Sequence, residues 1–348
     1  MFIDTPPKPV RWADRTMTVL RQERLQACEK ELAGLPQLSL FDAAVTDLDA
    51  ENFYAASWYA REERDHSLHS IEGLRARVLQ DLPASMLLLS PEEHDLMLRA
   101  VVLRGHLPVV HPESLFPALS LVRRGWGRLI RGAVVPVLEL PPPILLGAII
   151  ALADENHRSS HERFASCIET VDNTLYLAGL LNADIVVRDV MQTLADTPAA
   201  DHPMLCRIAL RSAFDTCTDR SGSLFLAHSG LADPDALLRA RRSAHDFWPV
   251  TRDAEDLSAA YESLTLLENP LYDQLYFLIQ GLTRQECSPE DTVEDLIILI
   301  KQGADFASLR EVLSSCLACM PTREMEAALQ EMLDRIPRWA SMQMGRLQ

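Results

Sequence analysis

The chain has 348 residues, 48% of them hydrophobic, and its 50 acidic and 33 basic side chains give a net charge of −17 at pH 7. This length and apolar fraction are enough for a sizeable hydrophobic core, which excludes an intrinsically disordered protein. A surface this acidic would repel a phosphate backbone, so nucleic acid is excluded as the expected partner.

The cysteines and the N-terminus indicate where the protein works. Seven cysteines are scattered without the regular spacing of a disulfide framework, so free thiols in a reducing compartment are expected. The N-terminal stretch MFIDTPPKPVRWADR has no basic segment followed by an apolar one, and it therefore does not match a secretory signal. We expect a protein of the bacterial cytoplasm.

Helical periodicity runs through almost the whole chain, and helix starts carry capping signals. The segments SPEE (90–93) and SPED (288–291) each place Ser at the N-cap, Pro at the first helical position and an acid at the third. The β-branched pieces at 133–137 and 185–187 are too short for strands or lie inside helical periods. The sequence therefore predicts an all-α protein, with helices at 11–33, 47–81, 91–104, 112–124, 142–157, 160–171, 173–182, 184–196, 203–217, 234–247, 253–267, 270–285, 289–302, 305–319 and 322–336.

Toward the C-terminus the predicted helices recur in pairs. Helix starts at Asp253, Ser288 and Thr322 are separated by 35 and 34 residues, a spacing that stacked helical hairpins produce. The expected fold class is a multi-helix bundle that passes into stacked, α-solenoid-like helical hairpins. We expect three units: an N-terminal helical unit (1–130), a central helical unit with a buried apolar helix (131–220) and an acidic helical-hairpin unit (221–348).

The stretch YAREERDHSLH (59–69), expected on the long second helix, contains an E-x-x-H pair, Glu63 and His66. Di-metal carboxylate proteins build their site from two such pairs and one Glu on each of two further helices. Asp154 and His157 could form a second pair, but no two further Glu residues have clear positions. The arginines beside the first pair favour ordinary ion pairs on a solvated helix face.

The stretch AVVPVLELPPPILLGAIIALA (133–153) holds one charged residue, Glu139, and its length fits a membrane span. Pro136 and the run Pro141–Pro143 interrupt it. This leaves 144–153 as uninterrupted helix, about 15 Å long, which is half the thickness of a bilayer core. We therefore expect a buried central helix in a soluble protein and no membrane span.

Two histidines and three carboxylates crowd the stretch DENHRSSHE (154–162). If one helix ran through it, Asp154, His157 and His161 would share a face and could bind a metal. Ser159 and Glu162, however, have the spacing of a capping box, which marks a new helix. We favour this second interpretation: a helix boundary inside the stretch, capped by Ser159, and a polar corner between two helices.

Motifs for enzymatic chemistry are absent. The sequence lacks the usual phosphate-binding, dinucleotide-binding and serine-hydrolase motifs. We therefore assign no catalytic residue, no cofactor and no metal in the preferred interpretation. Only under the alternative, metal-binding interpretation are the ligands Glu63, His66, Asp154, His157 and His161.

Most of the excess negative charge lies near the C-terminus, since residues 253–335 hold 17 acidic and 5 basic side chains, a net charge of −12. Apolar helix positions there can pack hairpin on hairpin, which would leave an acidic face in solvent. Such a face steers basic partners electrostatically. We expect the protein to bind another protein through the acidic face around Glu290, Asp291, Glu294 and Asp295, which Glu262 and Asp273 extend.

The chain length, the continuous succession of helices and the acidic C-terminal hairpins resemble the gatekeeper proteins of bacterial type III secretion. The resemblance covers the C-terminal hairpins and rests on helix order instead of on a motif. It implies an array of helical bundles that binds other components and catalyses no reaction. The polar N-terminal secretion segment usual in that family is not evident here, because helix is expected from Arg11.

The preferred hypothesis is therefore a non-enzymatic interaction protein: a scaffold, an adaptor or a regulator of the gatekeeper type. The alternative is a helical carboxylate and histidine metalloenzyme, similar to di-metal oxygenases. Near-stoichiometric iron, manganese or zinc in the purified protein would favour that alternative.

Overall fold

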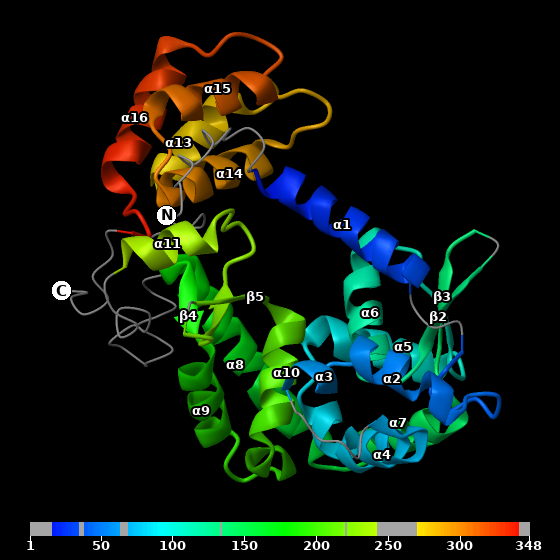
Figure 1. Cartoon of the computed structure of the whole chain (residues 1–348). Coiled ribbons are helices and arrows are strands. Elements are labelled where there is room, and N and C mark those ends of the chain that lie inside the picture. The colour runs from blue at the N-terminus through cyan, green and yellow to red at the C-terminus, as the bar shows by residue number, and fades with distance from the viewer. Residues whose placement is uncertain are drawn as a thin grey trace, which may run out of the picture. The chain divides into compact units, whose positions relative to one another are not determined.

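The computed structural model describes residues 16–34, 38–62, 69–132, 134–219, 221–241 and 270–340. These residues are mostly helical, as predicted, with a few short strands (Figure 1). The chain forms two compact units, each assembled from separate stretches. We call residues 23–172 with 182–226 the main unit, and residues 1–22, 173–181 and 227–348 the C-terminal unit. The expected three-unit division stays a prediction.

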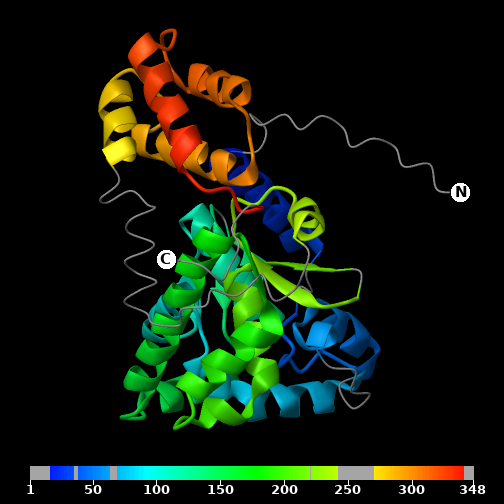
Figure 2. The same cartoon turned by 90° about the vertical axis from the view of Figure 1, so that its left-hand side faces the viewer.

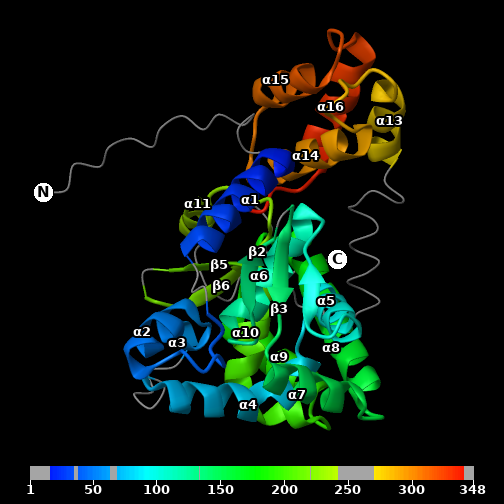
Figure 3. The same cartoon turned by 90° about the vertical axis from the view of Figure 1, so that its right-hand side faces the viewer.

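The main unit is built mainly from helices, which Figures 2 and 3 show from two further sides. Helices α1 (Met17–Gly34) and α8 (His157–Ala178) each contribute residues to both units. Within the main unit α4 contacts α2, α7 and α10, so it is the central helix. The helices that lie entirely in this unit are α2 (Asp47–Ala56), α3 (Tyr59–Glu62), α4 (Ile71–Leu87), α5 (Pro91–Val102), α6 (Leu115–Arg123), α7 (Pro142–Leu152), α9 (Ala183–Thr193) and α10 (Pro203–Ala213).

Short strands interrupt the helices. Strand β3 (Pro136–Glu139) pairs antiparallel with β1 (His106–Pro108) on one side and with β2 (Arg128–Arg131) on the other. The expectation that no strand would form was wrong, because strands of three or four residues are too short for an alternating pattern to show. The remaining strands are β4 (Leu180–Asn182), β5 (Asp215–Thr218) and β6 (Leu224–Ala227), of which β5 and β6 are neighbours.

Two helix starts confirm the capping signals. Ser90 Oγ accepts the Glu93 N–H at 3.2 Å while Glu93 Oε2 accepts the Ser90 N–H at 3.0 Å, so a full capping box begins α5. Ser288 caps α14 (Pro289–Gln302) by accepting the Asp291 N–H at 2.9 Å. An N-cap side chain satisfies N–H groups that have no partner within the helix, so such starts can be predicted from local sequence.

The single long helix expected at 47–81 is divided. Helix α2 ends at Ala56, α3 is a short turn, and α4 begins at Ile71 after its N-cap Ser70. The Ile71 N–H binds Asp47 Oδ1 at 3.1 Å, so the start of α4 lies beside the start of α2. The helical period of the sequence continues through the break. The start of α4 is marked by this long-range contact and by the Ser70 hydroxyl, which accepts the Gly73 N–H at 3.1 Å.

Helix α7 packs closely on α4 because of one glycine. A Cβ at Gly147 would lie 2.3 Å from Leu82 Cδ2, so a larger residue would push the two helices apart. Helix α7 also contacts α5. No helix in the described parts of the chain is both long and apolar enough to span a bilayer.

The C-terminal unit contains α11 (Pro234–Ala240), α13 (Pro270–Ile279), α14, α15 (Phe306–Cys316) and α16 (Arg323–Arg335). Helix α13 packs against α14 and α16, and α15 packs against the same two helices. These contacts join the first and last helices of the set of four, whereas in a solenoid each repeat contacts only its neighbours. The predicted solenoid-like stacking is therefore not confirmed.

A close approach at Gly179 forms part of the core of the C-terminal unit. Gly179 has a φ of +77°, and a Cβ there would lie 2.7 Å from Trp339 Cδ2. The Trp339 indole is fully buried and donates its Nε1–H to the Tyr176 carbonyl at 3.0 Å. The chain near its C-terminal end is thus held against the end of α8.

We predict that Gly179→Ala destabilises the protein more than Gly281→Ala. Gly281 has a φ of +76°, but a Cβ there meets no atom of the described residues within 4 Å. The control should lose only the cost of a left-handed backbone, about 1–2 kcal/mol, whereas Gly179→Ala should add about 1–3 kcal/mol for the clash with Trp339. Denaturant unfolding measures both losses, and equal losses would contradict the close approach.

Candidate functional site: a histidine cluster and an exposed apolar helix

A short turn separates α7 from α8. The Asn156 N–H binds Asp154 Oδ1 at 2.8 Å and the His157 N–H binds the Asp154 carbonyl at 3.0 Å, so the new helix begins at His157. The predicted boundary inside DENHRSSHE is confirmed, but its predicted cap, Ser159, is wrong. The Ser159 hydroxyl donates to the Asn156 carbonyl at 3.1 Å from inside the first turn. Asp154 closes this turn in place of Ser159, because its short side chain can accept the N–H of the residue two positions later.

This boundary places His157 and His161 four residues apart on one helix, so both imidazoles face the same side. His94 of α5 lies against them. Its Nε2 is 3.3 Å from His157 Nε2, and its ring stacks on that of His161 with centroids 3.8 Å apart. We call these three residues the histidine cluster. His94 was not predicted, because it precedes His157 by 63 residues and no local pattern connects the two helices.

Burial keeps the three imidazoles in their neutral form. Burial, and then the charges that His161 and His157 would carry, lower the pKa of His94 to about 4. Burial also lowers the pKa of His157, although Asp154 opposes this shift. Burial likewise lowers the pKa of His161, although a hydrogen bond to the Leu89 carbonyl, 3.1 Å long, opposes it. At neutral pH the cluster therefore offers nitrogen lone pairs instead of positive charge.

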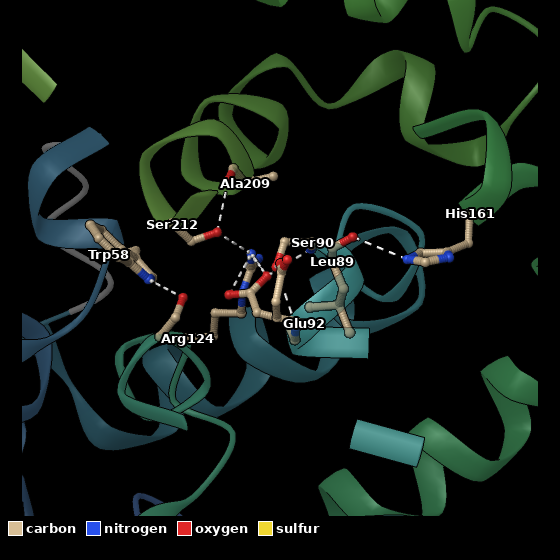
Figure 4. A network of polar contacts seen from close by, with 10 residues as sticks. Trp58, Leu89, Ser90, Glu92, Arg124, His161, Ala209 and Ser212 are labelled. Atoms are coloured by element: carbon tan, nitrogen blue, oxygen red, sulfur yellow. Dashed lines mark hydrogen bonds and ion pairs between the residues drawn. The ribbon is translucent and has the colours of Figure 1, made fainter. Parts of the chain in front are cut away.

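A buried ion pair holds the start of α5, directly before His94. Arg124 Nη2 lies 3.1 Å from Glu93 Oε2, and only 3% and 2% of the two side chains are exposed. Figure 4 shows Arg124 beside Ser212 of α10, whose Oγ accepts a hydrogen bond from Arg124 at 3.1 Å. Because Glu93 also belongs to the capping box of α5, this ion pair connects α5 with the end of α6, and Arg124 extends the connection to α10.

Helix α7 exposes an apolar side. Leu146, Ile149 and Ile150 are 60%, 45% and 64% exposed, whereas Ile144 and Ala148 are fully buried. We call the three exposed side chains the α7 face. The prediction of a buried central helix is wrong for this side, because α4 and α5 cover only the other side of α7. Composition alone favoured burial, since a helix that is apolar all round is usually surrounded by other elements.

The neighbouring helix α5 also exposes apolar side chains. Leu98 and Val102 are 39% and 78% exposed, and their spacing of four residues places them on one side of α5. Leu103, directly after the helix, is 47% exposed. Two helices in contact thus both carry exposed apolar side chains.

The alternative, metal-binding prediction lies only partly within the described residues. Glu63 and His66 lie outside them, and the Asp154 side chain is exposed in the turn before α8. No group of three or more His, Cys, Asp or Glu side chains in the described ranges has a geometry that could hold a metal ion. His157 and His161 meet a third imidazole instead of the carboxylates that a di-metal site needs.

The four acids predicted to form an interaction surface in the C-terminal unit do not share one exposed face. Glu290 and Asp291 are exposed and Glu294 is half-buried, but Asp295 is only 4% exposed, so its predicted place in solvent is wrong. Helix α14 is buried around most of its circumference, because α13 and α15 both pack against it. Of the two acids expected to extend the face, Asp273 is exposed and Glu262 lies outside the described residues.

The exposed acids of α14 lie against aromatic side chains of α13. Tyr276 donates its O–H to Glu290 Oε1 at 3.0 Å. Burial, and then the negative charges of Glu290 and Glu294, raise the pKa of Tyr272 to about 12. Phe277, whose ring contacts Tyr276 edge-on, is 67% exposed. This part of the C-terminal unit is therefore an acidic and aromatic patch.

A buried lysine in the C-terminal unit was not predicted. Lys301 is fully buried, and its Nζ lies 4.3 Å from the centroid of the Tyr176 ring. Within the described chain no hydrogen-bond acceptor reaches this Nζ. Burial lowers the pKa of Lys301 to about 7. The sequence held one signal for the burial of Lys301. This residue lies four positions after Ile297 and therefore falls among the apolar positions of α14.

Comparison of the chain with family models, with curated proteins and with solved structures finds no match.

We predict that Glu93→Gln lowers the free energy of unfolding by about 3–5 kcal/mol, because it leaves the Arg124 charge buried without its counter-charge. The adjacent Glu92 is exposed, so Glu92→Gln should change stability by only about 0.5 kcal/mol. Denaturant unfolding of the two variants measures the difference. A loss for Glu93→Gln as small as that of the control would show that the ion pair is not important for the fold.

We predict that Lys301→Met raises stability at pH 7, because it removes an amine that is costly to bury charged. The unfolded lysine holds its proton up to about pH 10.4, whereas the folded one releases it near pH 7. The unfolded state thus binds more protons between these values, so the stability of the wild type rises with pH across this window.

The gain from Lys301→Met should therefore be largest at pH 7 and below, and should shrink toward pH 10. The exposed Lys30 provides the matched control, and Lys30→Met should show no such trend. Unfolding free energies of wild type and both variants across this range measure the effect. If the gain from Lys301→Met stayed constant with pH, burial would not lower the pKa of the Lys301 amine, and the prediction would be wrong.

Proposed function

We propose that this protein is a non-catalytic interaction protein, a scaffold, adaptor or regulator, and that its α7 face binds an amphipathic helix of a partner protein. The observation that carries the proposal is the exposure of Leu146, Ile149 and Ile150 on one side of a helix. Hydration of apolar side chains is unfavourable, and contiguous exposed ones are typical of binding surfaces.

The spacing of the exposed side chains fits a helical ligand. The α7 face follows the i, i+3, i+4 pattern, so its side chains form a stripe along the helix. Helix α7 has 11 residues and is about 16 Å long, the length of a three-turn partner helix. Leu98 and Val102 form a second stripe on the adjoining α5. Two such stripes on helices in contact favour the binding of a third helix by its apolar side.

Basic side chains near this surface indicate the charge of the partner. Arg104 is exposed directly after α5, and Arg99 is exposed on α5, where it forms an ion pair with Asp95 one turn earlier. A Cβ at Gly105 would lie 3.6 Å from Leu145 of α7, so this end of α5 is adjacent to α7. We expect the partner helix to carry acidic residues beside its apolar side, because complementary charges increase the association rate and select the orientation.

The acidic and aromatic patch of the C-terminal unit is a second proposed surface, for a basic partner. Glu290, Asp291 and Glu294 supply the charge and Phe277 supplies exposed apolar area. Aromatic side chains are enriched in protein interfaces, and the surrounding charges steer the encounter. Asp295 does not belong to this surface, because it is buried.

The proposed class is a helical regulator similar to the gatekeepers of type III secretion, which the order of acidic helices near the C-terminus supports. The alternative, a di-metal oxygenase, has less support. His157 lies beside imidazoles, and no carboxylate in the described residues completes a bridging site.

Site-specific photo-crosslinking tests the proposed partner directly. A benzophenone amino acid in place of Ile150 should form an adduct with one partner protein in the native cell, and mass spectrometry should map it to an amphipathic helix with acidic neighbours. The same amino acid in place of Leu48, which is 92% exposed on α2 of the same unit, is the matched control and should give no such adduct.

Three outcomes would contradict the proposal. Equal adducts from positions 48 and 150 would show non-specific contact, and an adduct with a second copy of the chain would show self-association. An adduct with lipid would show that the α7 face binds a membrane surface.

A further inference from the structure

Two imidazole nitrogens of the histidine cluster lie at the separation that a shared metal ion requires. His94 Nε2 and His157 Nε2 are 3.3 Å apart. Zinc–nitrogen bonds are about 2.0–2.1 Å long, so two nitrogen ligands of one tetrahedral zinc ion are about 3.3–3.4 Å apart. The two rings come from different helices, α5 and α8. The agreement between their separation and that of two zinc ligands therefore does not follow from a local repeat of the sequence.

We propose that His94 and His157 chelate a zinc ion through their Nε2 atoms, with the remaining coordination positions taken by water or by a further ligand. This site lies within the main unit and goes beyond the proposed protein-binding function. With two protein ligands it does not need the three-residue group that is absent from the described residues. Such an open site suits an ion that exchanges, or one that a further ligand completes.

The chemistry of the two side chains suits this class of ion. Neutral imidazole is a good ligand for zinc and its neighbouring transition metals, whereas magnesium and calcium prefer oxygen. The exposed carboxylate of Asp154, three residues before His157, adds negative charge that favours a cation.

The surroundings hold the two ligands in place. The His161 ring stacks on His94 with an interplanar angle of 19°, and its Nε2 faces the Leu89 carbonyl at 3.1 Å. A carbonyl only accepts hydrogen bonds, so His161 Nε2 carries the proton and acts as a donor. His161 is therefore a positioning residue, and the Glu93–Arg124 pair fixes the turn of α5 that carries His94. Such support is typical of metal-binding histidines.

Calorimetric titration of the tag-free, full-length protein with zinc, after removal of metals with a chelator, tests the site. We expect one ion per chain, and His94→Asn and His157→Asn should each weaken binding roughly tenfold or more. His111→Asn alters an exposed histidine of the same unit and should leave the affinity unchanged. His161→Asn should weaken binding less than either ligand variant, because it removes support and no ligand.

A second measurement on the unaltered protein guards against variants that fail to fold. With ¹⁵N-labelled histidine, zinc should shift the Nε2 resonances of His94 and His157 and leave those of His111 in place. The proposal is overturned if zinc produces no such shifts, or if folded His94→Asn and His157→Asn proteins bind zinc as tightly as the wild type.

Discussion

The buried pair of Glu93 and Arg124 is the interaction on which the main unit depends most. Two charges removed from water stabilise a fold only weakly as a pair, but each is costly to bury without the other. The pair therefore restricts the geometry: Glu93 closes the capping box of α5, and Arg124 connects it with Ser212 of α10. Helix α5 is thereby held in one rotation about its axis.

The rotation of α5 about its axis determines which of its side chains face α8 and which are exposed. His94, Leu98 and Val102 follow each other at intervals of four residues, so they lie along one stripe of the helix. The first of them meets the imidazoles of α8, and the other two are exposed. The histidine cluster and the exposed apolar side chains of α5 thus follow one another along one stripe, and a change in the rotation of α5 would affect both.

Capping signals in the sequence predicted the helix starts that depend on neighbouring residues. Ser90 and Ser288 cap helices as expected, and a helix boundary lies inside DENHRSSHE. The remaining features depend on contacts between distant residues. His94 could not be connected with His157, the division of 47–81 depends on Asp47 reaching Ile71, and the exposure of Leu146 depends on how much of α7 its neighbours cover. Asp295 has the sequence context of a surface residue and is buried only because α13 and α15 surround α14.

The central claim is that the α7 face is a protein-binding surface, and side-chain footprinting tests it most directly. Photochemical carbene labelling would compare Leu146, Ile149 and Ile150 in the isolated protein with the same side chains in the complex purified from native cells. The account predicts strong labelling of the isolated protein and a clear loss of labelling in the complex, with Leu48 unchanged as the internal reference. Equal labelling of the α7 face in both samples would contradict the claim.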